Sequence, residues 1–224
     1  MRRFLALVFA LIAFASPVDA QRMSLQGVGR YVAPAGGGTT ATWNPSDKHA
    51  NVSLSGGNLI ASGTTSGYFS ARGTAAIVSG NKYYGEFVMN SVGGSDMAIG
   101  LANSSANLAD YISAGGGNSI GYFLGYGLML SDTPVSGYGS GWADNDRVGF
   151  AINGTTQRLY IRVNGGSWLN SGDPVAGTGG ADISALGATI YVALTFSLNT
   201  ESITANFGNS AFVDSVPSGY TAFP

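Results

Sequence analysis

The chain has 224 residues, of which 45% are hydrophobic and only 10% are charged, and its formal net charge is −2. With 10 Lys and Arg against 12 Asp and Glu, the chain offers no basic surface to a polyanion, so we expect no nucleic-acid partner. The absence of cysteine excludes disulfides, thiol nucleophiles and cysteine-ligated zinc, and it leaves His49 as the one histidine for imidazole chemistry.

The first 20 residues have the three-part layout of a secretory signal peptide. Arg2 and Arg3 carry positive charge, residues 4–16 form an apolar run, and Ala20 supplies a small residue at the expected cleavage site. The apolar run is shorter than the roughly 20 residues that a membrane-spanning helix needs. We therefore predict cleavage near Ala20 and a secreted or periplasmic protein without membrane attachment, and a retained anchor is the alternative.

Residues 21–39 show no hydrophobic period and end in the glycine-rich sequence PAGGGT. We predict that they form a flexible lead-in to a single folded domain over residues 40–224. In that domain, short runs of alternating apolar residues are separated by Gly, Asn, Asp and Ser at intervals of roughly ten to fifteen residues, which is the spacing of strands in a β-sandwich or barrel.

Apolar side chains recur at every second position in the clearest of these runs, which lie at residues 148–152, 159–163, 190–198 and 203–207. Asn153-Gly154 and Asn164-Gly165 are expected to form tight turns, because both residue types tolerate positive φ. The one helical candidate is a single turn over residues 182–186, which Asp182 could cap. Consecutive hairpins without crossover helices predict an all-β, antiparallel, two-sheet sandwich.

Several segments follow one another as they do in the SPRY domain family, and the chain resembles that family in the form found in bacterial and phage proteins. The segments are residues 42–47 (TWNPSD), 79–87 (SGNKYYGEF), 98–102 (AIGLA), 145–152 (NDRVGFAI), 159–168 (LYIRVNGGSW), 203–208 (ITANFG) and 219–220 (GY). The sequence departs from the family pattern at Asn145, where glycine is usual, at Gly85, where a large residue is usual, and over residues 121–142. The resemblance covers nearly all of residues 40–224.

The resemblance implies a single bent antiparallel β-sandwich of concanavalin-like jelly-roll architecture. It also implies a ligand surface formed by loops at one end, used mostly to bind protein, with no catalytic machinery and no cofactor. Loop tyrosines and tryptophans supply large, rigid contact area, and the least regular part of the domain contains Tyr111, Tyr122, Tyr126, Tyr138 and Trp142. We predict that these five form the ligand-binding surface, and a packing role for each is the alternative.

Two sequence patterns invite a catalytic or metal-binding interpretation. Residues 117–121 (GNSIG) match the G-x-S-x-G string of a hydrolase, but a nucleophile elbow needs a following helix and a downstream histidine, whereas His49 lies upstream. Asp144-Asn145-Asp146 could offer oxygen ligands to Ca²⁺, although such side chains commonly bond their own backbone in a turn. We predict glycine-rich and polar turns at these places, with no catalytic residue and no metal site.

Glu86 and Glu201 are the only glutamates, and no cluster of carboxylates resembles the pair that a glycosidase requires. We expect Glu86 instead to accept hydrogen bonds from neighbouring backbone or arginine groups. Taken together, these features predict a secreted, non-catalytic binding module for a protein or a cell-surface ligand. The alternatives are a carbohydrate-binding, lectin-like module and a phage-derived structural or tail-associated surface protein.

Overall fold

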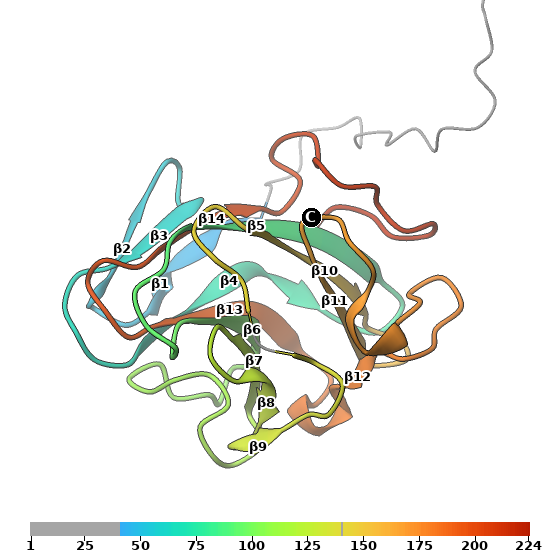
Figure 1. Cartoon of the computed structure of the whole chain (residues 1–224), viewed down its shortest axis with the longest axis horizontal. Helices are drawn as coiled ribbons and strands as arrows, with labels where there is room; N and C mark the ends of the chain where they lie inside the picture. Colours follow the sequence, from blue (N-terminus) through green and yellow to red (C-terminus); the bar gives the residue numbers. More distant parts are fainter. Residues whose placement is uncertain (1–40, 140) are drawn as a thin grey trace, which may run out of the picture. The chain divides into compact units, whose positions relative to one another are not determined.

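The structure is a computed structural model that describes residues 41–139 and 141–224. The predicted signal peptide and lead-in, residues 1–39, lie outside the described residues. In the described part of the chain, fourteen strands form two seven-stranded sheets, and every pair of neighbouring strands is antiparallel (Figure 1). The prediction of an all-β antiparallel sandwich is confirmed.

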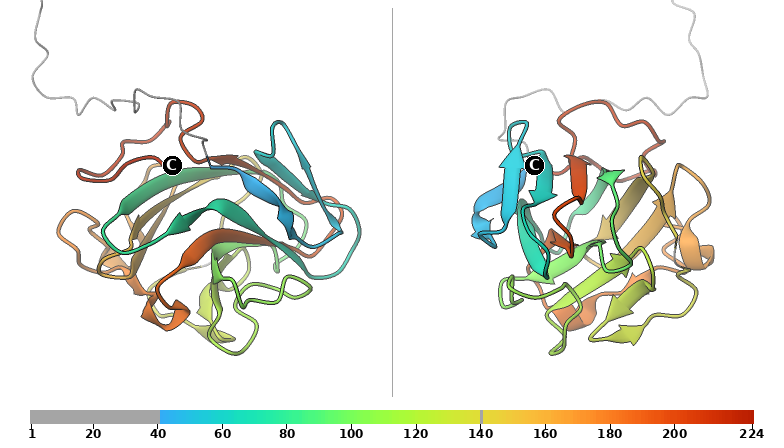
Figure 2. Two further views of the ribbon diagram at one scale, coloured as in Figure 1. Left: turned by 180° about the vertical axis from the view of Figure 1, so that it is seen from behind. Right: turned by 60° about the vertical axis from the view of Figure 1, so that its left-hand side comes forward.

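The two sheets lie face to face, as the two views of Figure 2 show. Sheet A contains, in spatial order, β1 (Trp43–Lys48), β4 (Phe69–Ile77), β13 (Ile190–Phe196), β6 (Ala98–Asn103), β7 (Ser119–Phe123), β8 (Gly127–Leu130) and β9 (Thr133–Pro134). Sheet B contains β12 (Ala181–Asp182), β11 (Arg158–Val163), β10 (Arg147–Asn153), β5 (Lys82–Ser91), β14 (Ser202–Asn206), β3 (Ile60–Gly63) and β2 (Val52–Ser55). The chain changes sheet repeatedly, so both sheets depend on strands from distant parts of the sequence.

The core between the sheets is built from side chains at alternate strand positions. In β13, for example, Val192 and Leu194 belong to the core, which matches the period of two that the sequence shows. Trp43, Phe87 and Phe207 form its aromatic part, with ring centroids 5.5 to 6.1 Å apart. These rings pack tilted or edge to face, an arrangement that aromatic quadrupoles favour.

Both sheets also bury part of their outer faces. Residues 104–118, here called the crossing loop, connect β6 to β7, and their Ile112 packs in a second apolar cluster on sheet A. Residues 207–224, here called the C-terminal segment, lie over sheet B (Figure 1), where Tyr220 packs with Tyr84 and Tyr160. The central strands are therefore buried on both faces, which is why β6 and β7 contain almost no polar side chains.

The two predicted turns need glycine for different reasons. In Asn164-Gly165, φ is 52° and 68°, so the predicted positive φ is confirmed. Between β10 and β11 the prediction of positive φ at Asn153-Gly154 is wrong, because the positive φ of 50° falls on Gln157. Gly154 is required there since a Cβ atom would collide with the carbonyl oxygen of Val78.

Helical structure is restricted to two short 3₁₀ turns, η1 (Leu169–Ser171) and η2 (Ser184–Leu186), in the described residues. The predicted turn near residue 182 is confirmed, since Asp182 Oδ1 accepts a hydrogen bond from the Ser184 N–H at 2.9 Å. This hydrogen bond lowers the pKa of Asp182. Neither helix is long or apolar enough to cross a membrane.

Candidate ligand-binding site

Four loops meet at one end of sheet A, here called the loop end, where β4 and β6 begin and where β7 and β13 finish. The loops are residues 64–68, 92–97, 124–126 and 197–201. Backbone hydrogen bonds of 2.9 Å join Gly67 N to the Ser197 carbonyl and Gly125 N to the Ser95 carbonyl. The four loops therefore form a hydrogen-bonded frame rather than independent segments.

The carboxylate of Glu201 holds this frame together from inside. It is fully buried and accepts hydrogen bonds from the backbone N–H groups of Ser197 (2.6 Å), Leu198 (3.0 Å) and Gly94 (3.2 Å). The first two bonds close the turn after β13, and the third ties that turn to the loop before β6. Charge-assisted bonds of this kind are stronger than those between neutral groups, so the carboxylate has a structural role.

Polar side chains on the outer face of sheet A anchor the crossing loop. Arg72 in β4 donates to the carbonyl oxygens of Asn103, at the end of β6, and of Ala106, in the crossing loop, at 2.8 and 3.1 Å. It also pairs with Asp47 at 2.7 Å. Thr195 in β13 accepts a hydrogen bond from the Ile112 N–H at 2.8 Å. The crossing loop is thus fixed to sheet A near its start and at its middle.

Small residues make room for the crossing loop. Ile112 lies in one cluster with Ala98, Ala102 and Ala193, whose short side chains let the loop approach the sheet. A Cβ atom on Gly121 would lie 2.9 Å from Ile112 Cγ1 and 3.0 Å from the Ile112 carbonyl oxygen, closer than real Cβ atoms pack. Gly121 therefore sets the position of Ile112 and of the residue before it, Tyr111.

A pocket of about 230 Å³, here called the aromatic pocket, lies at the loop end. It is lined by Tyr68, Asp96, Tyr111, Phe123, Tyr126 and Met129. Ring centroids are 5.1 Å apart between Tyr68 and Tyr111, and 6.1 Å apart between Tyr111 and Phe123. Tyr126 stands 6.2 Å from Phe123, and each ring is turned steeply from the next. Phe123 is buried, whereas Tyr68 and Tyr126 are 41% and 53% exposed, so the pocket opens to solvent between tyrosines.

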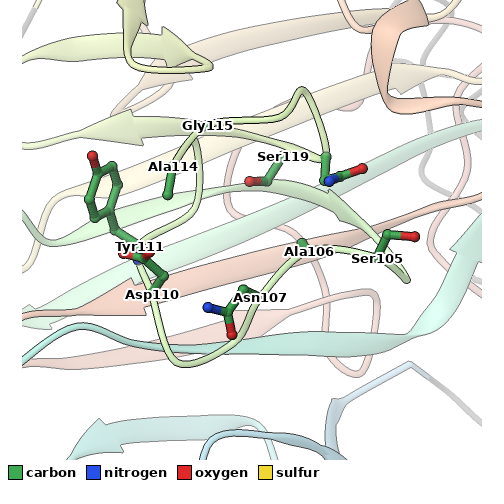
Figure 3. A pocket seen from close by; sticks show the side chains of 9 residues that line it. Ser105, Ala106, Asn107, Asp110, Tyr111, Ala114, Gly115 and Ser119 are labelled. Atoms are coloured by element: carbon green, nitrogen blue, oxygen red, sulfur yellow. The ribbon is translucent and has the colours of Figure 1, made fainter.

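A second pocket of about 190 Å³, here called the polar pocket, lies along the crossing loop (Figure 3). Asn107, Asp110 and Ser119 contribute amide, carboxylate and hydroxyl groups to its lining. Tyr111 lines both pockets, so a ligand that contacts this ring can reach either of them.

Carboxylates surround the tyrosines of both pockets. Tyr111 OH donates to Asp132 Oδ1 at 2.7 Å, and this hydrogen bond, together with burial and the charges of Asp132 and Asp110, raises the pKa of Tyr111 to about 12. Burial and the nearby charge of Asp96 raise the pKa of Tyr68. Among the described residues that line the two pockets there is no Lys, Arg or His. The electrostatic environment at this end of sheet A is therefore negative.

Solved structures with a similar fold are known, although the sequence itself has no match. No family profile and no curated protein matches the sequence. The SPRY domain of human HERC1 is similar in structure, with a TM-score of 0.59 and 12% identity over 73% of this chain and 96% of that one. The chain has a SPRY-like fold. The TRIM65 PSpry domain is similar too, with a TM-score of 0.51 and 11% identity over 75% of this chain and 90% of that one.

The SPRY-like domain is also similar to part of a larger toxin. The stonustoxin structure has a TM-score of 0.54 and 14% identity, over 75% of this chain and 27% of that one. At these identities the similarity shows the fold. The bacterial and phage form of the family stays a prediction.

In the SPRY-like domain, the five predicted contact residues fall into two groups, those that line a pocket and those that are buried in the core. Tyr111 and Tyr126 line the aromatic pocket. Tyr122, Tyr138 and Trp142 are 1%, 5% and 4% exposed and belong to the core, so they have the packing role that was the alternative. Tyr122 occupies an inward position of β7, and the segment after β9 folds its two aromatic side chains inward. Ligand contact by Tyr111 and Tyr126 stays a prediction.

The sequence analysis does not predict four residues of the aromatic pocket, which are Tyr68, Asp96, Phe123 and Met129. Tyr68 offers a signal, since it is an aromatic residue directly after the turn-forming residues 64–67 (TTSG). Phe123 resembles any apolar strand residue, and Asp96 resembles any polar loop residue. Their common position becomes visible only when β4, β6 and β7 are paired.

The motifs that resemble catalytic machinery have structural partners. Ser119 Oγ accepts a hydrogen bond from Ser113 N at 2.8 Å. His49 stacks on Phe69 with a centroid distance of 4.8 Å, and its Nδ1 accepts a hydrogen bond from Asn51 N at 3.1 Å. In both places the side chain accepts a hydrogen bond from a backbone N–H group.

The two aspartates of the Asp144-Asn145-Asp146 sequence also bond their surroundings. Asp144 Oδ1 accepts from Val92 N at 2.7 Å, and Asp146 Oδ2 accepts from Ala143 N at 2.7 Å, so these carboxylates shape a turn. In the described residues no three His, Cys, Asp or Glu side chains are grouped as a metal site would need.

Glu86 has the role that the sequence predicts for it. Its carboxylate accepts hydrogen bonds from Val213 N at 2.9 Å, Asp214 N at 2.8 Å and Tyr84 OH at 3.1 Å, and Arg147 Nε lies 4.0 Å away. This buried group fastens the C-terminal segment to sheet B.

Proposed function

We propose that this chain is an exported, non-catalytic binding module that recognises a protein ligand at the loop end, through the aromatic pocket. The observation that carries the proposal is the pocket itself, in which Tyr68, Tyr111 and Tyr126 surround an opening at the loop end of sheet A. The SPRY-like fold supports it, because the family resemblance implies a ligand surface made by loops at one end.

The rigidity of the loop end also supports binding. The Glu201 carboxylate and the backbone hydrogen bonds fix the loops, and the crossing loop that carries Tyr111 is held by Arg72 and Thr195. A fixed surface loses little conformational freedom when a partner binds, so more of the contact energy contributes to affinity. Tyrosine adds large contact area with only two side-chain torsions to order.

The partners of the acidic residues support a non-catalytic role. The carboxylates of Glu86 and Glu201 accept hydrogen bonds from backbone N–H groups, and a proton added to either would remove acceptors from these bonds. Export is proposed from residues 1–20 alone, whose signal-peptide layout directs the mature protein to the medium or the periplasm.

A carbohydrate ligand is a second candidate, which the polar pocket favours. Asn107, Asp110 and Asn118 offer amide and carboxylate groups beside the Tyr111 ring, an arrangement that suits hydroxyl groups next to an apolar sugar face. This candidate requires the ligand to occupy the polar pocket, whereas the proposed protein ligand requires the aromatic pocket.

Affinity capture tests the proposal. The purified protein is used as bait against the envelope and medium of the source cells, beside a double variant of the pocket, Tyr68→Ala with Tyr126→Ala. A second double variant, Val175→Ala with Val213→Ala, removes two exposed apolar side chains outside sheet A and is the matched control. All three proteins are first compared by circular dichroism and thermal unfolding.

We expect one protein, identified by mass spectrometry, to be retained by the wild type and by the control and lost by the pocket variant. Equal retention by the pocket variant would contradict the proposal. Retention of polysaccharide alone favours the carbohydrate candidate. Self-association in place of capture favours the structural, assembly-type alternative.

A further inference from the structure

The aromatic pocket combines exposed rings with nearby carboxylates that form no ion pair within the described residues. In the described part of the chain, the ion pairs join Arg72 to Asp47, Arg147 to Glu86 and Asp214, and Arg158 to Asp182. None of them includes Asp96, Asp110 or Asp132, the three carboxylates around the two pockets. Their negative charge is therefore not balanced locally by the described residues.

Asp96 is the carboxylate that lines the aromatic pocket itself. Its Oδ2 lies 3.4 Å from Tyr68 OH, at the long end of the hydrogen-bond range. An ionised carboxylate can accept about four hydrogen bonds, and this is the one side-chain bond it makes within the described residues. It keeps acceptor capacity for a ligand.

Arg72, on the same face of sheet A, does not neutralise this region. It is 6% exposed, lies beneath the crossing loop, and its Nε and Nη2 atoms each stand 2.7 Å from an oxygen of Asp47. Its charge is already matched by a bidentate partner, so it neither enters the aromatic pocket nor repels a cation from it.

We infer that the aromatic pocket receives a cationic side chain, lysine or arginine, of the protein ligand. This inference rests on the proposed function, and it specifies the charge of the partner side chain that the pocket binds. A cation within about 6 Å of a tyrosine ring is attracted by the ring quadrupole, and a nearby carboxylate adds a charge-assisted hydrogen bond. The Tyr111 hydroxyl donates to Asp132, so this residue offers its ring to the pocket rather than its O–H group.

The size of the pocket fits one side chain. Its volume of about 230 Å³ is below the range of about 300–1,000 Å³ that is typical of sites for drug-sized molecules. A single extended lysine or arginine head can enter between the tyrosines, while the rest of the partner lies on the surrounding loops.

Matched peptides test this inference directly. Two pairs of short, otherwise uncharged peptides carry arginine or citrulline, and lysine or norleucine, at one central position. Citrulline keeps the planar head of arginine without its charge, and norleucine keeps the length of the lysine stem. Each peptide is titrated into the purified protein, and affinities are read from backbone amide shifts in NMR spectra, with tetramethylammonium as a free cation for comparison.

We expect the charged member of each pair to bind about tenfold more tightly than the neutral member. The preference should weaken as salt is raised, because ions screen an exposed charge pair. Asp96→Asn should reduce the preference to about twofold, whereas Asp182→Asn, which removes an exposed carboxylate in β12 of sheet B, should leave it unchanged.

Three results would overturn the inference. Equal binding of charged and neutral peptides would show that the pocket does not require a cation. The absence of any peptide binding would show that the pocket does not receive such a side chain. Binding of tetramethylammonium without either charged peptide assigns the pocket to a free small cation instead. Affinity capture tests the proposed function separately. If the pocket variant loses the captured protein but the peptides show no preference for charge, protein binding at the pocket is supported and binding of a cationic side chain is not.

Discussion

Glu86, in β5 of sheet B, and Glu201, in the loop after β13, perform the same task. Each is a buried carboxylate that accepts hydrogen bonds from two consecutive backbone N–H groups, Val213 and Asp214 for Glu86, and Ser197 and Leu198 for Glu201. The sequence predicts this task for Glu86, because no second carboxylate accompanies it in the chain. It does not predict the partners of Glu201, since the geometry of the turn before it has no recognisable pattern.

Replacing Glu201 with glutamine should destabilise the protein by about 2–3 kcal/mol. The amide of glutamine would place its own donors against backbone N–H groups and leave at least one of them unsatisfied. Urea unfolding measures the loss, and Asp144→Asn is the control, because its remaining carbonyl oxygen can still accept the bond from Val92 N. Equal stability of the two variants would show that the Glu201 bonds do not hold the loop frame.

Trp142→Ala should cost about 3–5 kcal/mol, because this side chain is 4% exposed and its removal leaves a cavity. Tyr126→Ala should cost less than about 1 kcal/mol, because that ring is 53% exposed. Thermal or urea unfolding of both variants measures the contrast. A reversed order would contradict the burial of Trp142 and the exposure of Tyr126.

The crossing loop is the element that determines the site. Without it, the outer face of sheet A would expose Phe123 and a set of alanines, and neither pocket would have the Tyr111 wall. Its position depends on Gly121, which a sequence pattern presents only as one more glycine in a strand.

Gly121→Ala should lower stability by about 2 kcal/mol, because its Cβ atom would overlap Ile112. Gly139→Ala is the matched control, since a Cβ atom there meets nothing within 4 Å and its φ is not positive. Unfolding curves and amide hydrogen exchange at Ile112 distinguish the two. The same protection of the crossing loop in both variants would contradict its role as a closely packed element.

Elements differ in how far the sequence predicts them. The strands around 148–163 and 190–207 alternate clearly and are confirmed, because one face of each meets the core between the sheets. The region 104–142 is not predicted, since the crossing loop buries outward positions as well and removes the alternation. Two of the six residues that line the aromatic pocket, Tyr111 and Tyr126, are predicted. The other four belong to loops and strands that only strand pairing brings together.

At the scale of the whole molecule, burial of both faces of each sheet places several tyrosines out of water. Burial raises the pKa of Tyr122 to about 12 from its usual 10.0, and burial raises the pKa of Tyr84 and Tyr220 as well. A raised phenol pKa means that the folded protein keeps protons that the unfolded chain loses. The stability that these groups contribute is present below pH 10 and is lost as the pH rises toward 12.

The urea midpoint should therefore fall between pH 9 and pH 11.5, and it should fall less in Tyr122→Phe, which has no phenol to ionise at this position. Urea unfolding at several alkaline pH values measures both midpoints, and absorbance at 295 nm follows the ionisation. A midpoint independent of pH over this interval would contradict the burial of these rings.

The loop end is expected to be the ligand-binding face of the whole molecule. Amide hydrogen exchange of the protein, alone and with its captured partner, tests this most directly. Exchange should slow in residues 64–68, 92–97 and 124–126, which frame the aromatic pocket, and stay unchanged in the C-terminal segment over sheet B. Protection of the C-terminal segment, with no change at the loop end, would contradict the account.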